Sequence, residues 1–281
     1  MSGYIGWRDT KKNKHFRYVN DEDRDLLNDE ESADWAVQKI NELKSSNTSE
    51  PFFMAVGFVK PHTPLVAPQK YFDMYPLETL QLPVIKENDK DDTFYRSTFT
   101  RFTPSWALHY DYLSNSYDNI QEGLKTYLQA YMACVSFADE QVGKVLSAIE
   151  NSRFSNNTII ILTSDHGYNL GEKDFLYKNN LWEASTRVPL VIKAPSIPSS
   201  SGTIVNNPVS LIDIYPTIAD LCAIEKSNMK NEQGVPLSGH SLKPFILGGS
   251  FVDNWKGTDV VLTTGRALTS DLDPESHNYS V

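Results

Sequence analysis

The chain has 281 residues, of which 40% are hydrophobic and 22% charged, and its formal net charge is −10. The composition is typical of a globular protein, and an acidic surface of this kind repels nucleic acid and anionic membranes, so neither is an expected partner. No run of residues is long and apolar enough to predict a membrane span. An anionic substrate would need a locally positive site, built by a metal ion or by a few lysines and histidines.

The first quarter of the chain changes from polar to apolar. Residues 1–31 are rich in charge, and we expect an exposed polar lead-in there. Residues 32–44 have the apolar spacing of a helix, with Ser32 as its cap. Residues 51–58 are continuously apolar, which is typical of a strand buried on both faces. The prolines at 61, 64, 68 and 76 then predict an ordered loop.

The rest of the chain alternates between helical and strand patterns. We interpret residues 79–118 as an irregular excursion, and apolar residues three and four apart predict one long helix over residues 120–149. Strands are expected at residues 158–164, 187–195 and 259–265, and an amphipathic helix at 208–224. This alternation predicts an α/β fold in a single domain over residues 1–281, with a mostly parallel central sheet flanked by helices. Cys134 and Cys222 are expected to be buried free thiols.

Polar side chains follow the strand expected at residues 158–164. Asp165, His166 and Gly167 stand at its carboxyl end, where ligands bind in open α/β sheets. A carboxylate there is costly unless a cation or hydrogen-bond donors compensate it. An aspartate after a strand is also a common cap of a turn, so these three residues alone leave both readings open.

Further basic residues strengthen the functional interpretation. Lys60 and His62 follow the other apolar strand, and Lys173 and Lys178 lie in the loop after His166. A divalent cation held by carboxylates, with histidine and lysine facing an anion, is what hydrolysis of an anionic ester requires. Taken alone, His62 could be a loop histidine bonded to backbone, and Lys178 a solvated surface lysine.

Several long stretches together resemble a known family. They are "PFFMAVGFVKPHTPLVAPQKYFDMYP", "SFADEQVGKVL", "NNTIIILTSDHGYNLGE", "TRVPLVIKAP" and "VSLIDIYPTIADLC". The chain is similar over residues 51–248 to the sulfatases of the alkaline phosphatase-like superfamily, and most of all to the iduronate-2-sulfatase-like branch. The resemblance implies that fold and a sulfuric ester hydrolase.

The resemblance also implies roles for the matching residues. Asp165 and His166 match ligands of a calcium ion, and Asp165 is the firmer one because calcium prefers oxygen. His62 and Lys178 match catalytic residues of the sulfate pocket, and with Lys60 and Lys173 they are the expected substrate-binding residues. The implied substrate is a sulfated carbohydrate or another sulfate ester, and the family suggests a secreted, periplasmic or lysosomal location.

Parts of the family pattern are not found in the sequence. Sulfatases use a formylglycine made from cysteine or serine in the motif C/S-x-P/A-x-R, and Cys134, Cys222 and Ser196 all lack it. The paired aspartates that supply further calcium ligands are also absent. We therefore expect a partial sulfatase domain, incomplete at both ends, whose full-length parent is active with calcium while this chain alone is inactive and binds calcium poorly.

The sequence departs from the family pattern at two places, and two alternative functions stay open. Many relatives read Gly-Glu-His-Gly where this chain has Lys173 and Asp174, and Leu176 replaces a tryptophan, which puts the substrate preference in doubt. One alternative is a phosphodiesterase or phosphonate hydrolase of the same superfamily. The other is a non-catalytic binding protein that keeps the fold without the nucleophile. The oligomeric state is left open.

Overall fold

The computed structural model describes residues 8–9, 14–93, 108–197, 202–224, 233–266 and 277–280. The chain forms two compact units, the first made of residues 1–155 and 170–176 and the second of residues 156–169 and 177–281. The single domain over residues 1–281 stays a prediction. Across the described ranges, no helix combines the length and the apolar character needed to cross a membrane.

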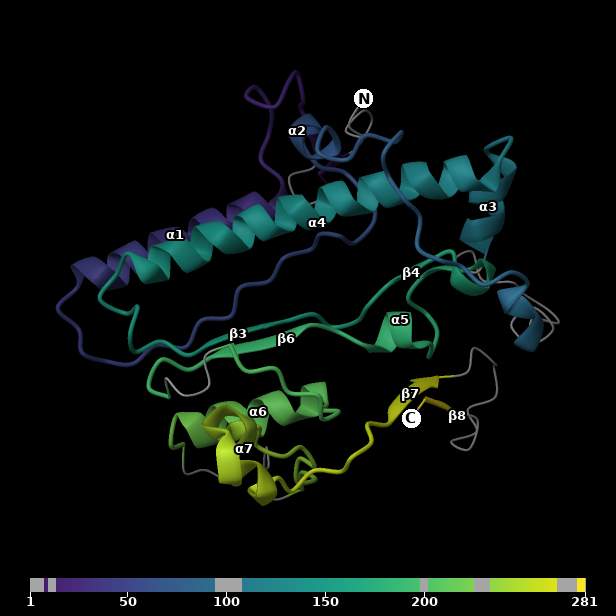
Figure 1. Ribbon diagram of the computed structural model, residues 1–281. Coiled ribbons are helices and arrows are strands. Elements are labelled where there is room, and N and C mark those ends of the chain that lie inside the picture. Colours follow the sequence, from purple (N-terminus) through teal and green to yellow (C-terminus); the bar gives the residue numbers. More distant parts are fainter. Residues whose placement is uncertain are drawn as a thin grey trace. The chain divides into compact units, whose positions relative to one another are not determined.

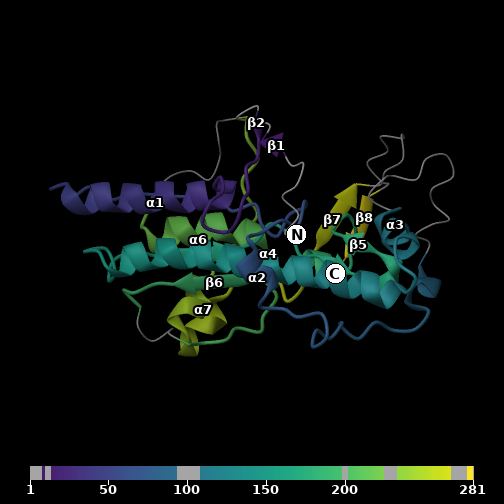
Figure 2. The ribbon, with the colours of Figure 1, turned by 90° about the horizontal axis from the view of Figure 1, so that it is seen from above.

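Two long helices form the frame of the first unit (Figure 1). α1 covers Asn28–Ser45 and α4 covers Ile120–Glu150, so the helix predicted over residues 120–149 is confirmed. The two helices lie side by side (Figures 1 and 2). They run in the same direction, because Lys44 near the end of α1 donates from Nζ to the carbonyl of Asn151, just past the end of α4, at 2.9 Å.

The shorter helices of this unit pack on the same frame. α2 (Gln69–Phe72) and α3 (His109–Asn115) both contact α4. Part of the excursion predicted at residues 79–118 falls on residues 94–107, which lie outside the described residues. The remainder includes α3 and the 3₁₀ turn Asp89–Asp92.

α1 begins before the predicted cap at Ser32. Its first residue is Asn28, and the carboxylate of Glu30 accepts the backbone N–H of Leu27 at 2.8 Å. This bond satisfies one of the N–H groups that a helix start leaves without a partner. Three consecutive acidic residues in the first turn, 29–31, also suit the positive end of the helix dipole. Residues 29–31, which were predicted to belong to an exposed polar lead-in, therefore form the first turn of α1.

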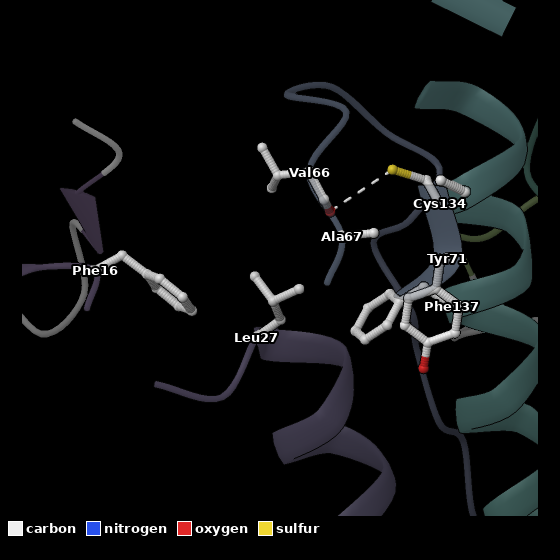
Figure 3. Packing of buried hydrophobic residues seen from close by; sticks show 8 residues of the cluster. Phe16, Leu27, Val66, Ala67, Tyr71, Cys134 and Phe137 are labelled. Carbon is white, nitrogen blue, oxygen red and sulfur yellow. Dashed lines mark hydrogen bonds between the residues drawn. The ribbon is translucent and has the colours of Figure 1, made fainter. Parts of the chain in front are cut away.

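The core of the first unit draws on that same polar segment (Figure 3). Its buried members are Phe16, Leu27, Val66, Ala67, Tyr71, Ala133, Cys134 and Phe137. The predicted exposed lead-in is wrong for Phe16 and Leu27, whose apolar side chains lie in the core, although several residues between them are exposed. Polar groups of the segment also find partners. Arg24 pairs with Glu30 at 2.5 Å with both side chains largely buried. The carboxylate of Asp21 accepts the backbone N–H groups of Gln69 and Lys70, both at 2.8 Å.

The apolar run at residues 51–58 does not form the predicted doubly buried strand. Residues 51–59 contain no assigned strand, and their side chains alternate between exposed and half-buried. Phe53 is 78% exposed. An alternating pattern shows that one face of the segment is covered within the described residues and the other is open. The continuous apolar character had predicted cover on both faces.

Two strands of the second unit, β3 (Ile160–Thr163) and β6 (Leu190–Lys193), pair with each other. Both strands were predicted, but they pair antiparallel, with Ile161 opposite Ile192. The parallel arrangement predicted for the sheet is therefore wrong for this pair. Hydrophobic runs indicate burial but carry no information on strand direction, and parallel pairing was inferred only from the alternation with helices.

Short helices complete the second unit. α5 covers Glu183–Thr186, α6 covers Ile214–Leu221 and α7 covers Lys243–Leu247. The helix predicted over residues 208–224 is thus shorter than expected, and a 3₁₀ turn, Leu211–Asp213, precedes it. The buried carboxylate of Asp213 accepts the N–H groups of Ser210 and His240, both at 2.8 Å, and so ties the start of α6 to the segment before α7.

The remaining elements are short. They are β1 (Arg8–Asp9), β2 (Lys14–His15), β4 (Asn169–Leu170), β5 (Leu176–Tyr177), β7 (Thr263–Arg266), β8 (His277–Ser280) and the 3₁₀ turns Glu172–Asp174 and Gly249–Asn254. β7 lies within and just after the strand predicted at residues 259–265. Of the two cysteines, Cys134 is buried as predicted, whereas Cys222 is exposed. Burial raises the pKa of the Cys134 thiol to about 12, which keeps it protonated and unreactive.

Candidate functional site

The loop after β3 presents Asp165 and His166. The carboxylate of Asp165 is 84% exposed, and its Oδ2 lies 3.5 Å from Nε2 of the partly exposed His166. The other ring nitrogen of His166, Nδ1, lies 2.8 Å from the carbonyl of Gly167. A carbonyl oxygen can only accept, so Nδ1 carries a proton, and Nε2 holds a lone pair whenever the ring is neutral. Two electron-pair donors therefore stand close together at the end of β3.

The backbone after these two residues is held against α5. The N–H of Gly167 donates to the carbonyl of Ser185 at 2.7 Å, and the N–H of Tyr168 donates to the carbonyl of Ala184 at 2.6 Å. A Cβ atom on residue 167 would lie 2.1 Å from the carbonyl oxygen of Ala184. Only glycine allows this close approach, which explains why it directly follows the Asp-His pair.

Asn169 links this loop to the segment that carries Lys178. Asn169 is completely buried, and its Nδ2 donates to the carbonyl of Tyr177 at 3.1 Å and to Oγ of Ser185 at 2.5 Å. The backbone just before Lys178 is therefore fixed to the loop that carries Asp165. The sequence did not predict this role, because a single asparagine in a polar loop has no distinguishing spacing.

Replacing Asn169 with alanine should lower the free energy of unfolding by about 1–3 kcal/mol, because the carbonyl of Tyr177 and the buried hydroxyl of Ser185 lose a donor. Chemical denaturation of the 281-residue chain measures this change. The exposed Asn207 of the same unit is the matched control, and Asn207→Ala should change stability by less than about 0.5 kcal/mol. Equal stabilities of the two variants would show that Asn169 does not hold the loop.

Lys178 directly follows β5 and is partly exposed. Among the described residues, no carboxylate forms an ion pair with its ammonium group, and the carbonyl of Lys178 accepts the N–H of Asn180 at 2.8 Å. The residue before it, Tyr177, has a backbone φ of +79°, which is rarely adopted outside glycine. Such a conformation persists only where neighbouring contacts impose it, as the hydrogen bond from Asn169 does here.

His62 lies in the first unit, in the proline-rich loop after residues 51–58. Its ring is exposed, and Nδ1 lies 2.6 Å from the carbonyl of Thr63, so Nδ1 carries the proton and Nε2 is free to accept. The backbone N–H of His62 donates to the carbonyl of Val59 at 2.9 Å. The Lys60–Pro61 and Thr63–Pro64 peptide bonds are both cis. Residues 61–68 contain no helix or strand, as the prolines predicted, whereas α2 lies between Pro68 and Pro76.

Lys60 and Lys173 differ from the free cations that the sequence predicted. Lys60 is only 9% exposed, and its ammonium donates to the carbonyls of His62 and Pro64. The ammonium of Lys173 pairs with the carboxylates of Asp89 at 3.0 Å and Asp92 at 2.9 Å, and these pairs raise its pKa. Both lysines are thus occupied by groups of the first unit, and their substrate contacts stay predictions.

A calcium site was predicted at Asp165 and His166. Within the described ranges, no group of three or more histidine, cysteine, aspartate or glutamate side chains could hold a metal ion. Calcium takes six to eight oxygen ligands, and Asp165 offers one accessible carboxylate. The chemistry of Asp165 therefore fits a calcium ligand, while the Asp-His pair cannot complete the coordination shell. The predicted metal residues lie in the second unit and His62 in the first, so their convergence on one pocket stays a prediction.

Comparison with known proteins decides the family. The family model described as Sulfatase matches residues 2–224. The chain belongs to the sulfatase family. The match starts well before residue 51, where the resemblance in the sequence was recognised. It includes the segment with Phe16 and Leu27, which agrees with the place of that segment in the core.

Two curated relatives give the extent of the likeness. A sulfatase of Formosa agariphila is 39% identical over 205 residues, which cover 71% of this chain and 37% of that protein. Iduronate 2-sulfatase of Homo sapiens is 31% identical over 233 residues, which cover 71% of this chain and 40% of that protein. This sulfatase chain therefore spans about two fifths of the length of the curated relatives it matches.

Solved structures confirm the fold class. A phosphonate monoester hydrolase from Silicibacter pomeroyi is similar with a TM-score of 0.65 at 23% identity, covering 93% of this chain and 48% of that one. A protein solved in complex with its substrate, D-glucosamine-2-N,6-O-disulfate, gives a TM-score of 0.57 at 21% identity, covering 85% of this chain and 56% of that one. The predicted alkaline phosphatase-like α/β fold is confirmed as that of sulfatases and phosphonate hydrolases.

Proposed function

We propose that this sulfatase chain is part of a calcium-dependent sulfuric ester hydrolase. The observation that carries the proposal is the pair of lone-pair donors after β3, the carboxylate of Asp165 and the imidazole of His166. The lone pair of His166 Nε2 lies 3.5 Å from Oδ2 of Asp165, and two such groups repel unless a cation or a second proton on the ring lies between them. A histidine that donates its other ring N–H to a backbone carbonyl is a common arrangement at metal sites.

In this proposal, each residue has a separate task. Asp165 supplies an oxygen ligand and His166 stands beside it, while His62 and Lys178 face the sulfate group. When bound, calcium would supply positive charge beside the sulfate oxygens and the nucleophile. The ammonium of Lys178 would neutralise charge on the sulfate oxygens as the ester bond breaks, and Nε2 of His62 is placed to accept a proton or a hydrogen bond.

The nucleophile in this proposal lies outside the present chain. The sequence contains no C/S-x-P/A-x-R motif, and the chain spans about two fifths of its curated relatives. We infer that a formylglycine and the remaining calcium ligands come from the rest of the full-length parent. The activity proposed here is accordingly that of the parent.

The proposed substrate is a sulfate ester on a carbohydrate. Support comes from the likeness to iduronate 2-sulfatase and to a structure that holds a disulfated glucosamine as its substrate. Phosphonate monoester hydrolysis is the second candidate, because a phosphonate monoester hydrolase is among the similar structures. The sulfatase function is favoured by sequence, since relatives named as sulfatases reach 39% identity and this hydrolase reaches 23%.

The two candidates are separated by kinetics on the parent protein. The purified full-length protein, loaded with calcium, is given an aryl sulfate and the matched aryl phosphonate monoester. We expect a higher kcat/KM for the sulfate and loss of that activity when calcium is removed with a chelator. A higher kcat/KM for the phosphonate would favour the second candidate, and no turnover of either ester would contradict both.

A further inference from the structure

We propose that Lys60 and Asp29 form a clamp that positions His62, and that Lys60 is a positioning residue with no contact to the sulfate group. The clamp consists of the Lys60 side chain, the Asp29 side chain and the backbone of residues 59–64. This inference deepens the proposed function and rests on it only for a kinetic test. Its structural test uses the present chain without any activity.

The loop that carries His62 is short of hydrogen-bond donors. Proline occupies positions 61 and 64, so neither position has a backbone N–H. Among the described residues, no backbone N–H bonds to the carbonyl of His62, while the carbonyl of Pro64 accepts the N–H of Val66 at 2.9 Å and keeps a second lone pair. Both carbonyls can therefore take a further donor, and an unpaired carbonyl away from water is costly. A side chain with several donors and no acceptor meets this need.

The ammonium group of Lys60 provides those donors. Its Nζ donates to the carbonyl of His62 at 3.3 Å and to the carbonyl of Pro64 at 2.5 Å. An ammonium group has three hydrogens, so two of them serve the loop itself. Because the bonded carbonyls belong to residues 62 and 64, the side chain of residue 60 closes the loop around His62.

Asp29 holds the same loop from α1. The carboxylate is 2% exposed, and its two oxygens accept the N–H of Val59 at 2.8 Å and the N–H of Lys60 at 2.9 Å. These are bonds between segments about 30 residues apart in the sequence, and each is strengthened by the charge of the carboxylate. Asp29 also provides the negative charge that a buried lysine needs nearby.

The orientation of His62 depends on this loop. The ring bonds through Nδ1 to the carbonyl of Thr63, which lies between the two carbonyls that Lys60 holds. Fixing the backbone therefore fixes the tautomer and the direction of Nε2. Burial lowers the pKa of the Lys60 ammonium, while the negative charge of the Asp29 carboxylate opposes this effect. A lysine so enclosed lacks the open ammonium group that a sulfate contact requires.

The structural test follows the tautomer of His62 by long-range ¹H–¹⁵N NMR of the imidazole rings in the 281-residue chain. The chain has six histidines, and loss of one signal in His62→Gln assigns the ring. We expect the Nδ1–H tautomer in the native chain, and a mixture of tautomers in both Lys60→Met and Asp29→Asn. The exposed Lys86→Met is the matched control and should leave the signal unchanged.

The kinetic test uses the calcium-loaded parent and the same variants. Lys60→Met and Asp29→Asn are each expected to lower kcat for an aryl sulfate by about 10–100-fold, with KM changed by less than about two-fold, because a misplaced site residue affects the reaction more than binding. The double variant should be no worse than the poorer single variant, since both changes open one clamp. The negatively charged Asp29 cannot bind sulfate itself. A fall in kcat for Asp29→Asn equal to that for Lys60→Met would therefore show that Lys60 acts by positioning His62.

Two results would overturn the clamp. The first is an unchanged His62 tautomer in Lys60→Met and Asp29→Asn, which would count against it whether or not the parent hydrolyses sulfate esters. The second is a raised KM and weaker inhibition by inorganic sulfate in Lys60→Met, with normal kinetics in Asp29→Asn, which would make Lys60 a sulfate contact. If Lys60→Met does not fold, Asp29→Asn takes its place, because Asp29→Asn keeps the side-chain volume. The tautomer of His62 in Asp29→Asn then decides whether the clamp exists.

Discussion

Replacing Asp165 with asparagine in the full-length parent is expected to lower kcat/KM for an aryl sulfate by about 10²–10³-fold. The change keeps the size of the side chain and one oxygen but removes the charge, and the loss of one preorganised electrostatic contact has effects of this size. The exposed carboxylate of Asp165 is accessible to a cation, whereas its neighbour His166 already has Nδ1 engaged by Gly167. Initial rates measured over a range of calcium concentrations test the prediction.

The exposed Asp253, also in the second unit, is the matched control for this experiment. Asp253→Asn removes the same charge from the same unit and should retain full activity and the same calcium dependence. Asp165→Asn should require more calcium for half-maximal activity. Full activity of Asp165→Asn at limiting calcium would show that the acid after β3 is a turn cap and not a metal ligand.

Replacing Phe137 with alanine is expected to destabilise the 281-residue chain by about 3–5 kcal/mol. Phe137 is fully buried near the middle of α4, and its ring lies 5.5 Å from the ring of Tyr71 in an edge-on arrangement (Figure 3). The truncation removes apolar contacts and leaves a cavity between α4 and α2, which carries Tyr71. Urea denaturation followed by circular dichroism measures the loss.

Phe53 offers the control for Phe137. It is the same residue type in the same unit, but its side chain is largely exposed. Phe53→Ala should change the free energy of unfolding by less than about 0.5 kcal/mol. A loss in Phe53→Ala equal to that in Phe137→Ala would mean that residues 51–58 are buried as the sequence had predicted, and that α4 is not the centre of the core.

Helical periodicity predicted the fold best where it was long. The repeat over residues 120–149 extends through many turns, so one face of α4 is specified many times over and its bounds agree closely. The run at residues 51–58 is apolar without any alternation of polar residues, so it does not indicate whether one or both faces of the segment are covered by other side chains. The segment before α1 was misjudged because Phe16 and Leu27 are isolated among charged residues, although they hold that segment in the core.

Candidate site residues were recognisable in the sequence where the chemistry is visible in adjacent residues. Asp165, His166 and Gly167 form a local pattern, and the exposed carboxylate and the close backbone approach at Gly167 agree with a site at the end of β3. Asp29 and Asn169 were missed because their roles depend on backbone groups that folding brings to them. Asp29 reaches a loop 30 residues away in sequence, and no spacing rule connects the two.

The proposed hydrolase requires that Asp165, Lys178 and His62 border a single anion pocket in the full-length parent. A crystal structure of the full-length parent with calcium and a slowly hydrolysed sulfate ester tests it most directly. We expect calcium about 2.3–2.6 Å from a carboxylate oxygen of Asp165, and one sulfate group within about 2.6–3.2 Å of both His62 Nε2 and Lys178 Nζ. A sulfate group bound away from either side chain, or His62 and Asp165 on opposite faces of the protein, would contradict the account.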